Sequence, residues 1–225
     1  MVALFRETNQ NNIDDVVVQA KNQLRAETIR ANRGHLEQLF YGYLERLQSR
    51  GCPKQILEMA CERKNEVVVK ASEMSIPEEH IPFVGPIIKP AYLGYYGLMS
   101  MVRNGDKEGY IYLDPLKIAD TVSTPDGLYW LYDVEDGEAV RGKASQDAEK
   151  LIKKEGRLGL TATEVVNLGI LTDVLSKHYV NAVGSRFDSD RVPYLYFFDG
   201  RPELYWFFLD YGDDHWGAAS CGSRG

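Results

Sequence analysis

The chain has 225 residues, 44% of them hydrophobic and 26% charged, which are the proportions of an ordinary globular protein. Its formal net charge is −7, and the acidic excess lies C-terminal to residue 76. Proteins that bind nucleic acids need clustered Lys and Arg to neutralise phosphates, so no nucleic-acid partner is expected.

Cysteine usage and hydropathy point to the reducing cytoplasm. Cys52, Cys61 and Cys221 fit neither a disulfide framework nor a Cys-x-x-Cys zinc site. The first ten residues lack the basic start and apolar run of a signal peptide. The longest uncharged apolar run, 91–102, is far shorter than the ~20 residues that cross a bilayer. We predict a soluble, cytoplasmic protein with no membrane partner.

The N-terminal third is predicted to be helical. Apolar residues recur at helical spacing over 13–33, 35–50 and 54–74, and Gly34, Gly51 and Pro53 interrupt the pattern between these segments. Residues 1–76 are therefore expected to form a helical bundle or hairpin of about three helices, through which the chain could form a homo-oligomer. Four prolines then fall within residues 77–90, which predicts an extended connection to a second domain over 91–225.

The remaining two thirds alternate between helix and strand signals. Thr161 and Glu164 have the spacing of a capping box at the start of a helix to about residue 176, and Ser145 could cap a helix to about 155. A short helix is predicted over 92–103. Aromatic and aliphatic runs between turn residues predict six strands, over 110–113, 128–134, 138–141, 192–198, 203–210 and 216–221.

These elements predict an α+β fold, in which the N-terminal helical bundle is followed by a mostly antiparallel sheet with two to three further helices. The runs 194–198 and 205–209 are too apolar for simple alternation, so both faces of these strands are expected to be buried. The chain contains 14 tyrosines, which either pack in the core or line a cleft for sugars, bases or peptides.

Five segments of the C-terminal part carry a resemblance to a known family. They are LGYYGLMSMVRNGDKEGY (93–110), YLDP (112–115), YDVEDG (132–137), VGSR (183–186) and WGAASCGSR (216–224). Over roughly residues 81–224 the chain resembles a bacterial family of unknown function. The resemblance implies a bacterial, cytosolic origin, and it implies no activity, cofactor or catalytic residue.

Cys221 is the candidate nucleophile. It is flanked by small residues that allow close backbone approach, and His178 or His215 could act as its base. The amides of Gly222 and Ser223 could then face an oxyanion. A free cysteine is more often a small buried hydrophobic residue, and the strand-to-helix elbow of a nucleophile is missing from this segment.

The tripeptide Gly-Ser-Arg occurs twice, as Gly184-Ser185-Arg186 and as Gly222-Ser223-Arg224. Glycine lets backbone amides surround an anion, serine adds a hydroxyl group, and arginine binds carboxylate or phosphate through two hydrogen bonds. If the two elements converge in space, they could hold a small anionic ligand or a peptide carboxylate. Alternatively, each arginine forms a structural ion pair with a nearby acid.

No metal site, cofactor site or well-known catalytic motif is predicted. Asp188, Asp190, Asp210, Asp213 and Asp214 with His215 lack the ligand spacing of a calcium loop or a zinc site. Dinucleotide-binding, P-loop, serine-hydrolase, deaminase and kinase motifs are missing from the sequence.

Three hypotheses follow. The first is a non-enzymatic binding protein that holds a small anion or a partner peptide near the two Gly-Ser-Arg elements. The alternative is a cysteine-dependent hydrolase or acyl transferase that uses Cys221. The third is an assembly role for the N-terminal helices.

Overall fold

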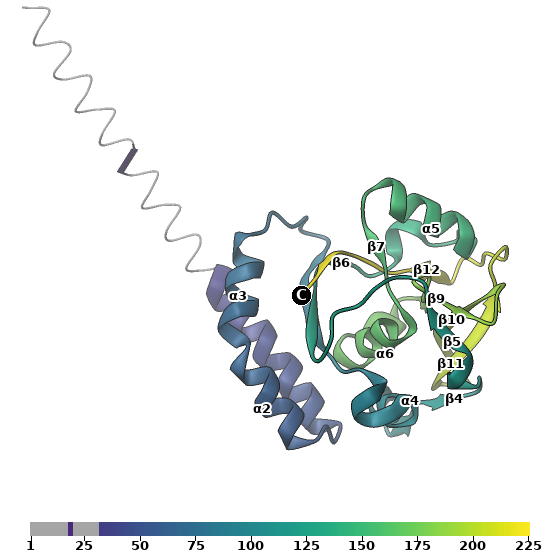
Figure 1. The fold of residues 1–225 in the computed structure, drawn as a ribbon, viewed down its shortest axis with the longest axis horizontal. Helices are drawn as coiled ribbons and strands as arrows, with labels where there is room; N and C mark the ends of the chain where they lie inside the picture. The colour runs from purple at the N-terminus through teal and green to yellow at the C-terminus, as the bar shows by residue number, and fades with distance from the viewer. Residues whose placement is uncertain (1–17, 20–31) are drawn as a thin grey trace, which may run out of the picture.

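The computed structural model describes residues 18, 19 and 32–225. Two β-sheets lie on either side of one central helix, α6, and the N-terminal helices cover the outer face of the smaller sheet (Figure 1). The helices are residues 32–49, α2 (Lys54–Glu62), α3 (Lys64–Glu73), α4 (Pro90–Met101), α5 (Ser145–Lys154) and α6 (Ala162–Leu171).

The smaller sheet has four antiparallel strands in the order β1-β6-β13-β7. These strands are β1 (Ile81–Ile87), β6 (Tyr129–Glu135), β13 (Ser220–Arg224) and β7 (Leu158–Gly159). The C-terminal strand β13 therefore lies next to the central strand β6. This places the second Gly-Ser-Arg element within the sheet.

The larger sheet has seven strands, and five of them follow the order β12-β8-β10-β11-β4. β9 pairs with β10 and β5 pairs with β9, while a separate small hairpin joins β2 to β3. Pairs β12–β8 and β11–β4 are parallel, whereas the other pairs are antiparallel. The strands of the larger sheet are β12 (Trp216–Ala218), β8 (Tyr179–Asn181), β10 (Arg191–Phe198), β11 (Arg201–Phe208), β4 (Tyr110–Ile111), β9 (Ser185–Phe187) and β5 (Ile118–Asp120). The strands of the hairpin are β2 (Arg103–Asn104) and β3 (Lys107–Glu108).

Helix α6 is buried along its entire length, because one side packs on β1 and the other on β10. Its sequence is apolar apart from a few polar residues, and these form hydrogen bonds inside the protein. Asn167 accepts a hydrogen bond from the Ile88 amide at 2.9 Å and donates one to the Ile88 carbonyl oxygen at 3.0 Å. A buried amide that pairs with both backbone groups of one residue fixes the helix relative to the end of β1.

The N-terminal helices pack on the smaller sheet through aromatic residues. The Phe40 ring lies 6.4 Å from Phe83 and 6.3 Å from Trp130, and the Tyr43 hydroxyl donates to the Phe83 carbonyl oxygen at 3.1 Å. Their buried residues belong to the same hydrophobic cluster as those of the sheets and α6. One continuous core therefore connects the helices over 32–73 to the rest of the protein.

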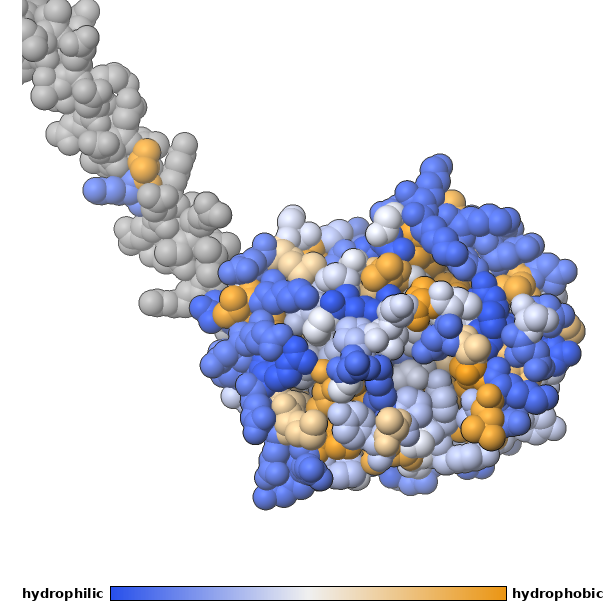
Figure 2. All heavy atoms as spheres, viewed as in Figure 1, coloured by the Kyte–Doolittle hydropathy of each residue, from blue (hydrophilic) through white to orange (hydrophobic). Residues whose placement is uncertain are grey.

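The surface viewed in Figure 2 is mostly hydrophilic, and its hydrophobic residues form small separate groups. Over the described residues, no helix combines the length and the apolar character that a membrane crossing requires. In the same part of the chain, no group of three or more His, Cys, Asp and Glu side chains is arranged to hold a metal ion.

The α+β class and the order of helices followed by sheet are confirmed. The predicted helix over 35–50, the capping box, and the hairpin formed by β10 and β11 are also found. The predicted helix over 13–33 lies mostly outside the described residues. The proline-rich segment 77–90 contains strand β1, in which Pro82 and Pro86 are accommodated.

Several element predictions were wrong. The strand over 138–141 is a short 3-10 helix (Glu138–Val140), because β6 already pairs on both edges and Glu135 accepts hydrogen bonds from the Gly137 and Ala139 amides. The helix after Thr161 ends at Leu171, where the chain becomes extended. The helix over 54–74 divides into α2 and α3, and the strand over 216–221 divides between the two sheets.

The prediction that both faces of the hairpin are buried holds for part of its length. Leu195 and Leu204 point into the core, and Val192 and Tyr194 are buried on the opposite face. Farther along that face, Tyr196, Tyr205 and Phe207 are only half-buried. Aromatic rings in contact with one another keep this outer face only partly exposed to water.

Candidate functional site

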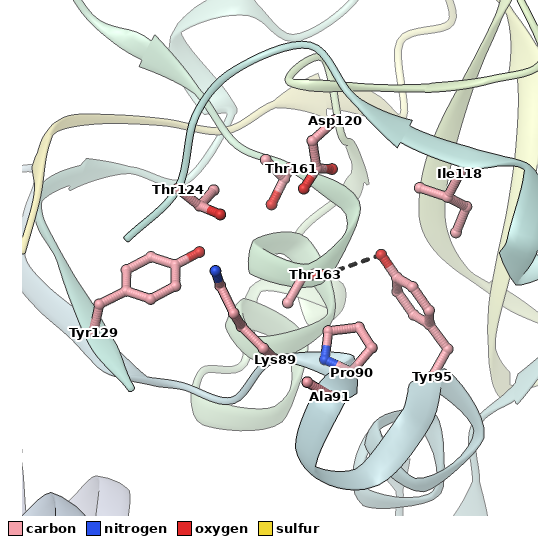
Figure 3. Close-up of a pocket in the computed structure, with 10 residues that line it drawn as sticks. All are labelled: Lys89, Pro90, Ala91, Tyr95, Ile118, Asp120, Thr124, Tyr129, Thr161 and Thr163. Carbon is pink, nitrogen blue, oxygen red and sulfur yellow. Dashed lines mark hydrogen bonds between the residues drawn. The ribbon is translucent and has the colours of Figure 1, made fainter. Parts of the chain in front are cut away.

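A polar cavity of about 270 Å³ lies beside the N-terminal end of helix α6 (Figure 3). Its walls come from the start of α4, strand β5, the segment before β6, and the first turn of α6. The lining residues are Lys89, Pro90, Ala91, Tyr95, Ile118, Asp120, Thr124, Tyr129, Thr161 and Thr163.

The capping box fixes the first turn of α6. Thr161 Oγ1 accepts a hydrogen bond from the Glu164 amide at 3.3 Å, and Glu164 Oε2 accepts one from the Thr161 amide at 2.7 Å. Because Glu164 is fully buried, its charge needs compensation. Arg224 provides it through two hydrogen bonds, of 2.6 Å from Nε and 2.8 Å from a terminal nitrogen, and the Tyr129 hydroxyl adds a third at 3.0 Å.

The first Gly-Ser-Arg element supports the same turn from the other side. Ser185 Oγ accepts a hydrogen bond from the Ala162 amide at 2.8 Å and donates one to Asp120 Oδ1 at 2.6 Å. Arg186 does not face the cavity, since it binds Glu149 at 2.6 Å and the carbonyl oxygens of its neighbours. The carboxyl group of Asp120 thus has one oxygen held by the protein.

The two Gly-Ser-Arg elements therefore converge on the N-terminal end of α6. Their arginines pair with Glu149 and Glu164 rather than with the acids near them in sequence. Their glycines allow close packing: a Cβ atom on Gly184 would lie 2.6 Å from the Gly159 carbonyl oxygen, and one on Gly222 would lie 2.6 Å from Asp133 Oδ2. Ser223 pairs with Tyr132 in the sheet. None of the six residues lines the cavity. Ser185 and Arg224 support it from behind, through Asp120 and the first turn of α6.

Cys221 lies in strand β13 between β6 and β7 and is fully buried. Burial raises the pKa of its thiol to about 12, which is opposite to the shift that activates a nucleophile. His178 is buried near Asp136, and His215 is exposed in the loop before β12. In the described part of the chain, no hydrogen bond joins Cys221 to either histidine.

His178 has a structural setting of its own. Its Nδ1 lies 3.0 Å from the Tyr179 carbonyl oxygen, and its Nε2 lies 3.6 Å from Asp136 Oδ1, which is too long for a hydrogen bond. Burial lowers the pKa of His178, but the Asp136 carboxylate, the Tyr179 carbonyl and the Glu138 carboxylate together raise it above its usual value. The two neighbouring acids and the Tyr179 carbonyl thus stabilise the charged form of His178 by more than burial destabilises it.

Lys89 brings a positive charge to the cavity. Its ammonium group points into the space between Tyr129 and Thr163 in Figure 3. The nearest carboxylate is that of Asp126, at 3.9 Å, and Asp126 is fully exposed. An ion pair with an exposed partner at this distance is weak, so most of the attraction of Lys89 for an anion remains available.

The remaining polar groups of the cavity are neutral hydrogen-bonding groups or a carboxyl group. Tyr95 and Thr163 share a hydrogen bond of 3.0 Å, and burial raises the pKa of Tyr95 to about 12. Burial also raises the pKa of Asp120 above its usual value, with a further contribution from the nearby Glu164. The cavity thus combines one ammonium group, several hydroxyl groups and one carboxyl group that loses its proton less readily than usual.

Sequence reasoning did not identify Lys89, Asp120 or Thr124 as site residues, and it offered Tyr95 and Tyr129 only among the 14 tyrosines that either pack in the core or line a cleft. They lie in three separate segments, and none belongs to a recognisable motif. Two sequence signals did lie near the cavity: the capping box, which marked the helix end around which these segments gather, and the repeated Gly-Ser-Arg element, which supports that helix end.

A comparison with known protein families matches residues 46–225 to a family of unknown function, DUF5701. The chain belongs to this family. The match begins at residue 46, within the N-terminal helices. The similarity of this DUF5701 chain to its family therefore extends beyond the predicted region 81–224. No curated protein and no solved structure matched the chain.

Proposed function

We propose that the protein is a non-enzymatic binding protein, and that the cavity at the N-terminal end of α6 holds a small organic molecule with an anionic group. The observation that carries this proposal is the Lys89 ammonium group, which points into a cavity of about 270 Å³ and, among the described residues, forms one ion pair, with the exposed Asp126. Drug-sized ligands occupy pockets of roughly 300–1,000 Å³, so the ligand should be a small metabolite.

The other lining groups support a ligand that also carries hydroxyl or amide groups. Thr124, Thr161 and Thr163 offer hydroxyls, which both donate and accept hydrogen bonds. Asp120 offers the oxygen that Ser185 does not hold. An anionic group beside Lys89 and a hydrogen-bond donor beside Asp120 would satisfy both charged residues of the cavity.

In this proposal the two Gly-Ser-Arg elements act on the ligand indirectly. Ser185 positions Asp120 and the first amide of α6, and Arg224 neutralises the Glu164 carboxylate behind the cavity. Without Arg224, the negative charge of Glu164 would oppose an anionic ligand. We also infer that the protein acts in the bacterial cytoplasm, in keeping with its cysteine usage and family resemblance.

A cysteine-dependent hydrolase is not the function proposed here. The pKa of Cys221 is raised rather than lowered, and the side chain is inaccessible to a substrate.

The test is a ligand screen with a matched pair of variants. The full-length protein is heated in the presence of single carboxylates, dicarboxylates and phosphate monoesters, and compounds that raise its Tm are titrated by NMR. At least one anion is expected to shift the signals of Thr161 and Thr163. Lys89→Gln should weaken its binding at least tenfold, because it removes the charge that faces the ligand.

The control is Lys154→Gln, which removes a positive charge from an exposed position at the end of α5. It should leave the affinity unchanged. Equal weakening by the two substitutions would show a general effect of net charge and would contradict the proposal, as would a screen in which no anion shifts the two threonine signals.

A further inference from the structure

A second surface lies on the outer face of the seven-stranded sheet, away from α6. Side chains alternate along β10, so that Leu195 packs in the core while Tyr194 and Tyr196 point outward. Figure 1 shows α6 to one side of β10 and β11. Helix α5 covers one end of the opposite face, where Asn181 donates a hydrogen bond to Ser145 and Ala218 packs on the helix.

Beyond the end covered by α5, this outer face carries tyrosines from the adjacent strands β8, β10, β11 and β4. We call the set the tyrosine face. The strand register places Tyr196 opposite Glu203, Glu203 opposite Tyr110, and Tyr194 opposite Tyr205. The ring centroids of neighbouring members lie 4.7–6.2 Å apart. Its members are Tyr110, Tyr112, Tyr179, Tyr194, Tyr196, Glu203 and Tyr205.

Glu203 is the one acidic member of the tyrosine face and lies at its centre. Its residue exposure is 3%, and one carboxylate oxygen accepts hydrogen bonds from the Tyr110 hydroxyl at 2.8 Å and the Tyr196 hydroxyl at 3.0 Å. Within the described part of the chain, no Lys, Arg or His forms an ion pair with it. Arg201, two residues before it, stacks on the Tyr110 ring at 4.4 Å and donates to the Glu108 carbonyl oxygen instead.

A buried carboxylate without a counter-ion is costly, and a cation brought next to it from outside would be stabilised. Tyrosine rings add to this attraction, because the negative potential of an aromatic face attracts ammonium and guanidinium groups. The neighbouring loop adds acidic residues, since Asp210 and Asp214 are exposed on either side of Tyr211 in the sequence, and Tyr211 packs on Phe207 and Trp216. The charge of this surface is complementary to a basic partner.

We propose that the tyrosine face binds a basic peptide segment of a partner protein, with an arginine or lysine side chain seated over the tyrosine rings beside Glu203. A second copy of the chain is disfavoured as the occupant, because each copy carries a net charge of −7 and an acidic loop at this surface. This proposal is independent of the function proposed above, because the tyrosine face and the cavity share no residue.

The probe is a hexa-arginine peptide with blocked ends, titrated into the full-length protein and followed by tyrosine and tryptophan fluorescence. Glu203→Gln keeps the size of the side chain and an oxygen for the two tyrosine hydroxyls but removes the charge. Tyr112→Leu removes a ring that is 67% exposed, so this variant should fold even if Glu203→Gln does not. Each substitution is expected to weaken binding by about five- to tenfold.

Two matched controls separate this site from general charge attraction. Tyr96→Leu removes a ring of similar exposure, 70%, on α4, and Glu58→Gln removes an exposed acid on α2. Both should bind the peptide like the parent. Failure of the parent to bind hexa-arginine would overturn the proposal, and so would equal weakening in the controls. Binding of neutral cellohexaose to this face in place of the peptide would overturn it as well, since it would identify a sugar platform.

Discussion

Arg224 stabilises the folded protein and also lies close to the proposed site. Its guanidinium group is the only basic partner that the described residues provide for the fully buried Glu164 carboxylate. If Arg224 only bound a ligand, its replacement would abolish binding without unfolding the protein. The ion pair with Glu164 means that binding and stability cannot be separated at Arg224.

We predict that Arg224→Met lowers the free energy of unfolding by about 3–5 kcal/mol, because it leaves a buried carboxylate without its counter-ion. Urea unfolding followed by tryptophan fluorescence measures this loss. Adding Glu164→Gln to the same variant should recover part of the stability, since the buried charge is then gone. Lys54→Met, at an exposed ion pair on α2, should cause no measurable change. A loss as small as that of the control would show that the buried pair is dispensable.

At the scale of the element, helix α6 organises both the fold and the site. Its polar residues each have a defined partner: Glu164 at its start binds Arg224, and Asn167 in its middle binds Ile88. A helix buried on all sides can carry such residues only when every polar group is satisfied. Asn167 is therefore expected to matter more than its small size suggests.

We predict that Asn167→Leu lowers the free energy of unfolding by about 2–4 kcal/mol, because it leaves the amide and carbonyl groups of Ile88 buried without partners. Urea titration followed by circular dichroism tests this. The control is Asn104→Leu, which removes an exposed hydrogen bond of 2.9 Å to the Gly200 carbonyl oxygen and should change stability by less than about 0.5 kcal/mol. The prediction fails if the two variants are equally stable.

The elements that the sequence predicted well are those with local causes. The Thr161–Glu164 capping box and the β10–β11 hairpin each depend on residues a few positions apart. The strand predicted over 138–141 failed because its outcome depended on a distant segment: β13 already occupies the free edge of β6. Local signals cannot show which strand will fill an edge.

The same limit explains why most of the candidate site was missed. Lys89, Asp120 and Thr161 come from three elements that meet only in the folded chain. The repeated Gly-Ser-Arg tripeptide did indicate where segments converge, because both copies support the start of α6. What it could not show is that both arginines are engaged by Glu149 and Glu164, which are distant in sequence.

At the scale of the whole molecule, the continuous core predicts that the fully buried Cys221 becomes reactive only when the protein unfolds. Cys221 lies in this core with a pKa raised to about 12, whereas Cys61 is exposed on α2. Iodoacetamide at about pH 8 should therefore label Cys61 rapidly in the native protein and leave Cys221 unmodified. With increasing urea, labelling of Cys221 should follow the same transition as the loss of helical circular dichroism, because local opening does not reach the centre of the smaller sheet. Rapid labelling of native Cys221 that persists below about pH 7 would instead reveal an accessible thiolate, and a cysteine-dependent reaction would then replace ligand binding as the leading function.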